Sequence, residues 1–179
     1  MLNPRVIVLI GMITAAALSR LLPHPPNMTS VTAIALFGGA YFADRRLALL
    51  VPCAALLFSD MVLGLYAHME VIYLTFALIV CLGFWLRNRQ TATNIAGAAL
   101  ASSVLFFMIT NFGTWALGSL YPKTIDGLMA CYIAGIPFFQ NTLLGDLLYS
   151  ALLFGGFTLL ESQLVSLREP PLSTNMQGC

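Results

Sequence analysis

The thiols are the most versatile reactive groups in this sequence. Cysteines stand at positions 53, 81, 131 and 179, with no short paired spacing, so they indicate neither a zinc site nor a disulfide framework. Cys81 lies in the middle of the apolar run LIVCLGFW, residues 78–85. A cysteine in such a run usually packs as a small hydrophobic side chain. Its thiolate would nevertheless be a soft ligand for a metal.

Two carboxylates also lie in apolar runs, Asp60 in FSDM and Asp146 in LLGDLLY. Ionisable residues at such positions usually face the interior of a helix bundle or a water-filled cavity. We expect both aspartates to bond to neighbouring helices or to pair with Arg20. An intramembrane acid–base pair is the alternative, but no substrate-positioning motif lies beside them. His24 and His68 form no HExxH pattern, so the sequence does not indicate a membrane metalloprotease.

These groups are carried by a chain that is too apolar for a soluble domain. Of its 179 residues, 59% are hydrophobic and 8% are charged, and the mean hydropathy is +0.89. We therefore predict an all-α integral membrane protein with one membrane domain over residues 1–179. The net charge of +1 and the scattered basic residues indicate no nucleic-acid binding. Residues 1–22 also have features of a signal peptide, but a first membrane helix suits the apolar segments that follow.

Apolar runs separated by charged or proline-containing turns predict a bundle of six transmembrane helices, each of about 20 residues. The predicted helices cover residues about 4–22, 29–43, 47–66, 70–86, 93–118 and 141–161. The second helix is short and contains Gly38 and Gly39, which favours a bend or a start within a folded loop. Residues 124–139 are apolar but include Pro137, and we predict an outer capping or re-entrant segment there. Residues 162–179 form a predicted cytoplasmic tail.

The basic residues predict the orientation of this bundle. On one side lie Arg5, Arg45, Arg46, Arg87, Arg89 and Arg168, and on the other lie Arg20 and Lys123. By the positive-inside rule the first side is cytoplasmic, and so are both termini. The outer loops are longer and richer in aromatic, amide and histidine side chains, which is typical of the lid of a binding cavity, although outer loops are longer in many membrane proteins. No internal repeat supports a secondary transporter with paired broken helices.

Three segments resemble a known family of small membrane proteins: SRLLPHPPNMTSVTAIALFGGAYF, TNFGTW and YIAGIPFFQNTLLGDLLY. They are similar to the substrate-binding S-components of energy-coupling-factor vitamin transporters, and most of all to the solitary cobalamin transporters of BtuM type, over the chain to about residue 161. The resemblance implies a six-helix bundle in the bacterial inner membrane that takes up cobalamin from the outer face. It also implies either an energy-coupling module with ATPases as partner or no partner. Gly11 and Ala15–Ala17 offer a docking face on the first helix, and ordinary packing within the bundle is the alternative role of these small residues.

The resemblance further implies that a cysteine thiolate binds the cobalt of the corrin. We select Cys81, because Tyr73 and Ala77 lie on the same helical face: the small side chain of Ala77 leaves room above the thiol, and Tyr73 would border the corrin ring. Cys131 and His24 are the alternative axial ligands. A thiolate on the cobalt of cyanocobalamin would also expel cyanide, which would make Cys81 catalytic as well as metal-binding.

A further set of polar and aromatic residues is expected to contact the corrin, although its aromatic members are equally typical of anchors at the membrane interface. They are His24, Asn27, Met28, Thr29, Tyr66, His68, Tyr73, Asn111, Trp115 and Tyr121. Two other functions stay open at this point. The chain could bind a different vitamin or small molecule, or it could be a membrane helper subunit without a ligand of its own.

Overall fold

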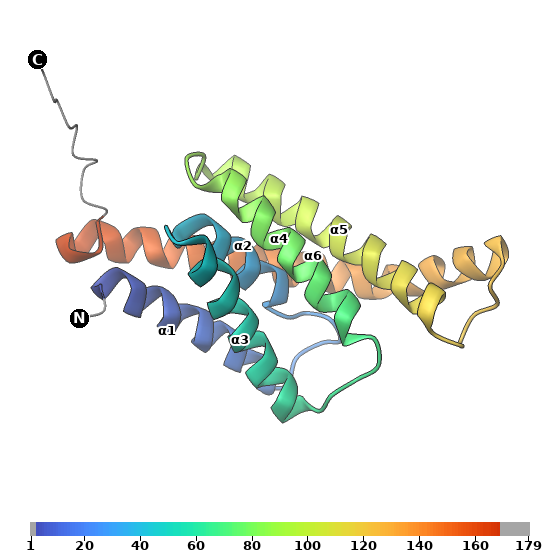
Figure 1. The fold of residues 1–179 in the computed structure, drawn as a ribbon. Coiled ribbons are helices and arrows are strands. Elements are labelled where there is room, and N and C mark those ends of the chain that lie inside the picture. Colours follow the sequence, from blue (N-terminus) through green and yellow to red (C-terminus); the bar gives the residue numbers. More distant parts are fainter. Residues whose placement is uncertain (1–2, 169–179) are drawn as a thin grey trace, which may run out of the picture.

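The computed structural model describes residues 3–168, which form helices joined by loops, without a β-strand in that range (Figure 1). The elements are α1 Pro4–Leu18, η1 Ser19–Leu21, α2 Val31–Tyr41, α3 Arg45–Leu63, α4 Met69–Leu86, α5 Ala92–Leu117, α6 Ile125–Gln163 and η2 Val165–Leu167. Five stretches are long and apolar enough to cross a membrane: Pro4–Leu21, α3, α4, α5 and α6. The chain is therefore a multi-pass, all-α membrane protein. Cys179 and most of the predicted tail lie outside the described residues.

The short helix α2 forms the core of the bundle. All eleven of its residues are buried, and it contacts each of the other five α-helices. At 1.5 Å per residue it is about 16 Å long, roughly half the thickness of the hydrocarbon layer. Close packing on α4 needs glycine at two facing positions, because a Cβ on Gly39 would lie 2.2 Å from Val80 O and one on Gly83 would lie 2.5 Å from Leu36 O. The predicted short helix is correct, and it begins and ends two residues inside its predicted limits.

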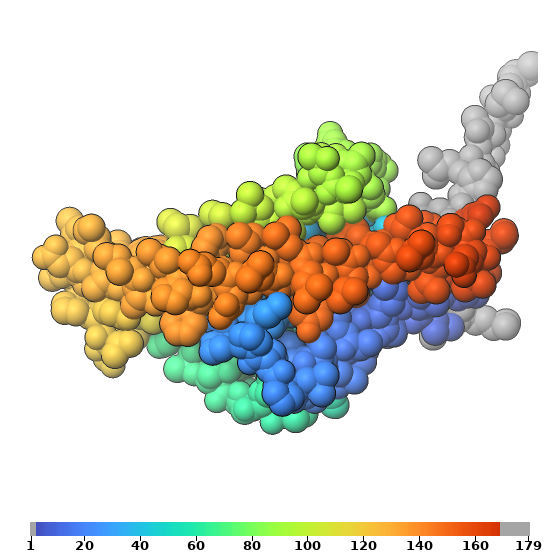
Figure 2. Space-filling model, turned by 180° about the vertical axis from the view of Figure 1, so that it is seen from behind, coloured from blue at the N-terminus to red at the C-terminus, as the bar shows by residue number. Residues whose placement is uncertain are grey.

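The longest helix, α6, differs from its prediction. The expected outer cap, residues 124–139, and the expected helix 141–161 form one helix of 39 residues. Pro137 lies within it and breaks one backbone hydrogen bond without ending the helix. The first half of α6 is held by α5: a Cβ on Gly135 would lie 2.6 Å from the Asn111 side chain, and the Tyr132 hydroxyl donates to Met108 O at 2.8 Å. In Figure 2, α6 runs along the whole of one face.

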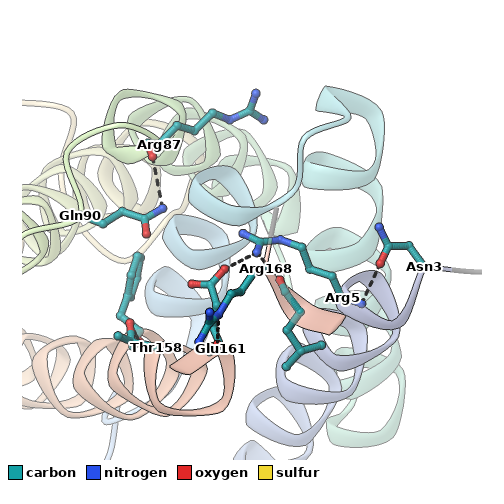
Figure 3. A network of polar contacts seen from close by, with 9 residues as sticks. Asn3, Arg5, Arg87, Gln90, Thr158, Glu161 and Arg168 are labelled. Carbon is teal, nitrogen blue, oxygen red and sulfur yellow. Dashed lines mark hydrogen bonds and ion pairs between the residues drawn. The ribbon is translucent and has the colours of Figure 1, made fainter. Parts of the chain in front are cut away.

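Both described ends of the chain lie at the same end of the bundle. Arg5 Nη1 lies 2.5 Å from Glu161 Oε1 and donates to Leu167 O at 2.6 Å, which ties α1 to the end of α6 (Figure 3). Arg87 donates from Nε to Gly39 O and from Nη2 to Phe42 O, so it caps the C-terminus of α2 at that end. We call this the basic end, since Arg5, Arg45, Arg46, Arg87, Arg89 and Arg168 gather there. The opposite loop end carries residues 22–30, 64–68 and 118–124.

Candidate functional site

Two adjoining cavities lie at the loop end of the bundle. One has a volume of about 200 Å³ and the other about 240 Å³. They share four lining residues, Asn27, Ile72, Phe106 and Thr142, which come from the first loop and from α4, α5 and α6. We call the pair the loop-end cavity. Its walls combine amide, hydroxyl and charged groups with aromatic and aliphatic side chains, as the binding site of an organic ligand requires.

The first loop, residues 22–30, is fixed to the middle of α6. Asn141 Nδ2 donates to Pro26 O at 2.9 Å, and Gly145 lets the backbone of Thr29 approach so closely that a Cβ would lie 3.1 Å from it. Asn27 adopts a left-handed conformation with φ of 62°, which asparagine tolerates better than most residues. In Figure 2 this blue segment crosses the middle of the orange α6. The loop therefore forms part of the cavity wall, alongside the start of α2.

A buried ion pair stands at one side of the loop-end cavity. Arg20 Nη2 lies 2.8 Å from Asp60 Oδ1, and the Asp60 side chain is fully buried. Asp60 Oδ2 accepts a hydrogen bond from Tyr73 at 2.9 Å and a longer one from Tyr66 at 3.4 Å. Burial, and then the charge of Asp60, raise the pKa of Tyr66 to about 12, so this hydroxyl stays protonated and donates. Arg20 Nη1 also donates to Ser59 Oγ at 2.5 Å. The predicted pairing of Asp60 with Arg20 is confirmed.

A second carboxyl group, Asp146, lies on the α6 wall of the same cavity and is 1% exposed. Its Oδ2 is 2.5 Å from Ser103 Oγ on α5, and the buried hydroxyl of Thr32 on α2 lies nearby without a hydrogen bond to a described group. No ion pair within residues 3–168 includes Asp146. The predicted pairing with Arg20 thus holds for one aspartate, while the other bonds to the Ser103 hydroxyl on a neighbouring helix.

The start of α2 also faces this cavity. Ser30 occupies the N-cap position, but its hydroxyl donates to Ala16 O at 2.6 Å and does not cap the helix. Val31 and Thr32, in the first turn of α2, line the cavity, so the positive end of the helix dipole lies at its wall.

The structure brings together some of the predicted site residues and separates others. Asn27, Thr29, Tyr66 and Asn111 line the loop-end cavity. Tyr73 supports it through Asp60. His24 is exposed on the first loop, where its ring nitrogens lie near Arg20 O and Pro25 O, and Met28 packs beside Gly145.

The remaining predicted contacts lie outside the cavity walls. His68 has a left-handed backbone at the start of α4, with its ring 3.4 Å from Glu70. Trp115 lies in the last turn of α5 and Tyr121 in the loop between α5 and α6; Trp115 Nε1 donates to Pro122 O at 2.9 Å and Lys123 Nζ donates to Trp115 O. Trp115 and Tyr121 line neither of the two cavities.

The thiols have very different surroundings. Cys81 is exposed on the outward face of α4, in line with Leu78 and Trp85, and it lines neither of the two cavities. Cys131 is buried between α6 and α5, 3.4 Å from Asn111 O, and lies one helical turn from the cavity-lining Gly135. Among the described residues, no three histidine, cysteine or acidic side chains gather in a way that could hold a metal ion. The prediction that Tyr73, Ala77 and Cys81 share a cavity-facing stripe is not supported by this placement.

Several cavity residues were not predicted. Ile72, Phe106, Thr110 and Thr142 are ordinary members of apolar helices, and nothing in their types sets them apart. Only Thr142 could have been found from the sequence, because it lies four residues before Asp146 and therefore on the same face of α6.

Comparison with known proteins gives a family but no characterised relative. The model of a family of unknown function, DUF6580, matches residues 1–169. No curated protein and no solved structure matched the sequence. The match extends over nearly all of the chain, including every helix and both carboxylates of the loop-end cavity. The chain therefore belongs to DUF6580, a family of unknown function.

Proposed function

We propose that this chain is a membrane-embedded binding protein for the uptake of a small molecule, and that the ligand is cobalamin. The observation that carries the proposal is the loop-end cavity, because a concave site with a few convergent polar groups among apolar walls is the usual form of a ligand site. Four of the residues expected from the sequence, Asn27, Thr29, Tyr66 and Asn111, line it. The choice of cobalamin rests on the resemblance to the S-component transporters.

The proposed setting is the bacterial inner membrane, with the loop end outside. Six arginines gather at the basic end, whereas the loop end holds Arg20 and Lys123, so the positive-inside rule favours a cytoplasmic basic end. The shared position of Arg5 and Glu161 implies an even number of crossings. Five long helices and one short buried helix meet this condition if residues 22–30 and α2 together complete the second crossing. The result is a six-span bundle with both termini in the cytoplasm.

The cavity is closed on the cytoplasmic side by packed aromatic rings. Phe37 and Tyr41 on α2 contact Phe154 and Phe157 on α6, with ring centroids 4.6 to 6.0 Å apart. Below them Arg5 lies over the Phe157 ring, 5.1 Å from its centroid. This closure suits a protein that receives its ligand from outside, and release to the cytoplasm requires the helices to move apart.

Cobalamin is larger than the cavity as the structure has it. Pockets for drug-sized molecules occupy about 300–1,000 Å³, and the two adjoining cavities hold about 200 and 240 Å³. The first loop and the α5–α6 hairpin therefore have to open for a corrin. This observation favours a smaller organic molecule as the second candidate ligand.

The position of Cys81 in the structure does not suit the role of axial cobalt ligand that the resemblance led us to expect. Cys81 was selected from the sequence, but its side chain lies on the outer surface of α4. Cys131 and His24 lie closer to the loop-end cavity, and one of them fits a corrin bound there more directly. Binding of cobalt by Cys81, with loss of cyanide from cyanocobalamin, requires the corrin to lie against the outer face of α4 or the helix to turn.

The test is to purify the protein with cyanocobalamin and record the corrin absorption spectrum. Bound corrin is expected, and replacing its axial ligand should change the spectrum. Cys81→Ala, Cys131→Ala and His24→Ala are compared, with Cys53→Ala as the matched control because Cys53 packs on α3 away from the loop end. Free cyanide released in proportion to bound protein indicates a thiolate ligand. A colourless preparation that gives no heat of binding with cobalamin, while binding smaller vitamins, would overturn the choice of ligand.

A partner module remains a proposal as well. Gly11 and Ala15 lie on the outward face of α1, and no neighbouring atom fills the space beside Gly11. Small residues at this spacing permit close approach of another helix. Gly11→Leu should impair uptake in whole cells without changing cobalamin binding by purified protein if α1 docks on an energy-coupling partner. Unchanged uptake would favour a protein that works alone.

A further inference from the structure

Asp146 is a buried carboxyl group that forms no ion pair among the described residues. It lies on α6, on the wall of the loop-end cavity, and is 1% exposed. Asp60 stands in the same part of the bundle and is equally buried, but Arg20 lies 2.8 Å from it. The two carboxyl groups therefore have opposite surroundings, one beside a guanidinium and the other beside the hydroxyls of Ser103 and Thr32.

A count of hydrogens favours the protonated form of Asp146. Ser103 Oγ lies 2.5 Å from Asp146 Oδ2 and 3.1 Å from Ala99 O, and both distances fit hydrogen bonds. A serine hydroxyl has one hydrogen to donate, although its oxygen can also accept. If Asp146 is a carboxylic acid, it donates to Ser103 and Ser103 donates to Ala99 O. If Asp146 is a carboxylate, Ser103 can direct its hydrogen fully to only one of the two oxygens.

Desolvation points the same way. An isolated carboxylate in an apolar interior is so unfavourable that the group takes up a proton instead. The groups that face Asp146 partly oppose this. Arg20 and Tyr66 line the same cavity, Asp60 lies behind Arg20 and Tyr73 behind Asp60, and the α2 N-terminus presents a positive dipole. None of the residues from α4 and α5 that line the loop-end cavity carries a charge. Arg20 and the helix dipole lower the free energy of the carboxylate form, so Asp146 can both lose and regain its proton.

We propose that Asp146 is a proton-binding site whose occupancy is coupled to the contents of the loop-end cavity. A ligand that fills the cavity displaces water from beside Asp146, which favours the acid, so ligand and proton bind together. In the empty cavity, water and Arg20 favour loss of the proton to the outer solution. By linkage, a ligand that raises the proton affinity must itself bind more tightly at lower pH. The coupling to cobalamin rests on the proposed function, whereas the protonation of Asp146 does not.

The protonation is tested without any ligand, by infrared spectroscopy of the protein in lipid vesicles. A buried carboxylic acid should give a carbonyl band at neutral pH that is absent from Asp146→Asn and retained in Asp126→Asn, the matched control on the exposed first turn of α6. Ser103→Ala should move the band to higher frequency, because the acid loses its acceptor. A wild-type spectrum without a band that depends on Asp146 overturns the proposal, even if the protein binds cobalamin.

The coupling is tested with cyanocobalamin as the probe. Affinity of the wild-type protein should fall as pH rises, by at most tenfold per pH unit for a single linked proton. Asp146→Asn mimics the acid, so its affinity should be independent of pH, while Asp126→Asn should behave as wild type. A pH dependence that survives in Asp146→Asn overturns the coupling. If cyanocobalamin does not bind at all, the proposed function fails while the infrared band still decides whether Asp146 holds a proton.

Discussion

Replacing Arg20 by glutamine should destabilise the bundle more than almost any other single change at its loop end. The variant leaves Asp60 fully buried with only the hydroxyls of Tyr73 and Tyr66 as partners, at 2.9 and 3.4 Å. Removing one member of a buried ion pair costs about 3–5 kcal/mol. The loss of stability cannot much exceed about 4 kcal/mol, because the unpaired aspartate can take up a proton instead, and keeping an ordinary aspartate protonated at pH 7 costs about that much. We therefore expect a loss of about 3–4 kcal/mol in the free energy of unfolding.

The measurement is an SDS-unfolding titration in mixed micelles, followed by circular dichroism. Asp60→Asn and the double variant Arg20→Gln/Asp60→Asn complete a double-mutant cycle. The double variant should be more stable than Arg20→Gln alone, because it leaves no stranded charge. Arg46→Gln, at an exposed position on the first turn of α3, is the control and should change stability by about 0.5 kcal/mol or less. Additive losses in the cycle, or a loss below about 1 kcal/mol for Arg20→Gln, would refute the reasoning.

Three further predictions concern the packing, the exposure and the ionisation of single residues. Gly83→Ala should destabilise the bundle by about 1–3 kcal/mol, since its Cβ would lie 2.5 Å from a backbone carbonyl of α2, whereas Gly97→Ala meets open space and should be neutral or stabilising in the same titration. Cys81 should react with a membrane-permeant maleimide in the folded protein and Cys131 only after unfolding; equal labelling in mass spectra would contradict the exposure of Cys81 and the burial of Cys131. The pKa of Tyr66 is raised to about 12, so its neutral hydroxyl stabilises the network fully below pH 10 and loses that effect as pH rises from 10 to about 12; an unchanged tyrosinate absorbance curve in Tyr66→Phe would contradict this.

The sequence predicts the spans well because a bilayer imposes a simple condition on composition. Long apolar runs must become helices whose backbone groups bond internally, and the described α3, α4 and α5 begin and end within three residues of their predicted limits. The partner of Asp60 was predictable for a similar reason, since a buried charge in an apolar helix needs an opposite charge at the same depth. Arg20 offers that charge at the loop end.

The direction of Cys81 could not be predicted from composition. In a soluble helix, polar residues mark the outward face, but α4 is apolar on all sides because lipid and protein core are equally apolar. Its inward face is determined instead by Gly83, which permits contact with α2, and Cys81 lies away from that contact. The continuity of α6 through Pro137 could not be predicted either, because it depends on packing against α5, which no local sequence pattern indicates.

The length of α2 explains why a cavity exists at the loop end. This helix fills the axis of the bundle from the basic end up to Thr32, and its eleven buried residues reach only about half of the membrane thickness. Beyond Thr32 the axis is occupied by an irregular loop, which cannot fill space as densely as a helix and must bond its backbone to neighbours such as Asn141. Irregular backbone at membrane depth is stable only beside protein or water. The polar side chains of the site, including Asp60 and Asp146, therefore gather where the central helix stops.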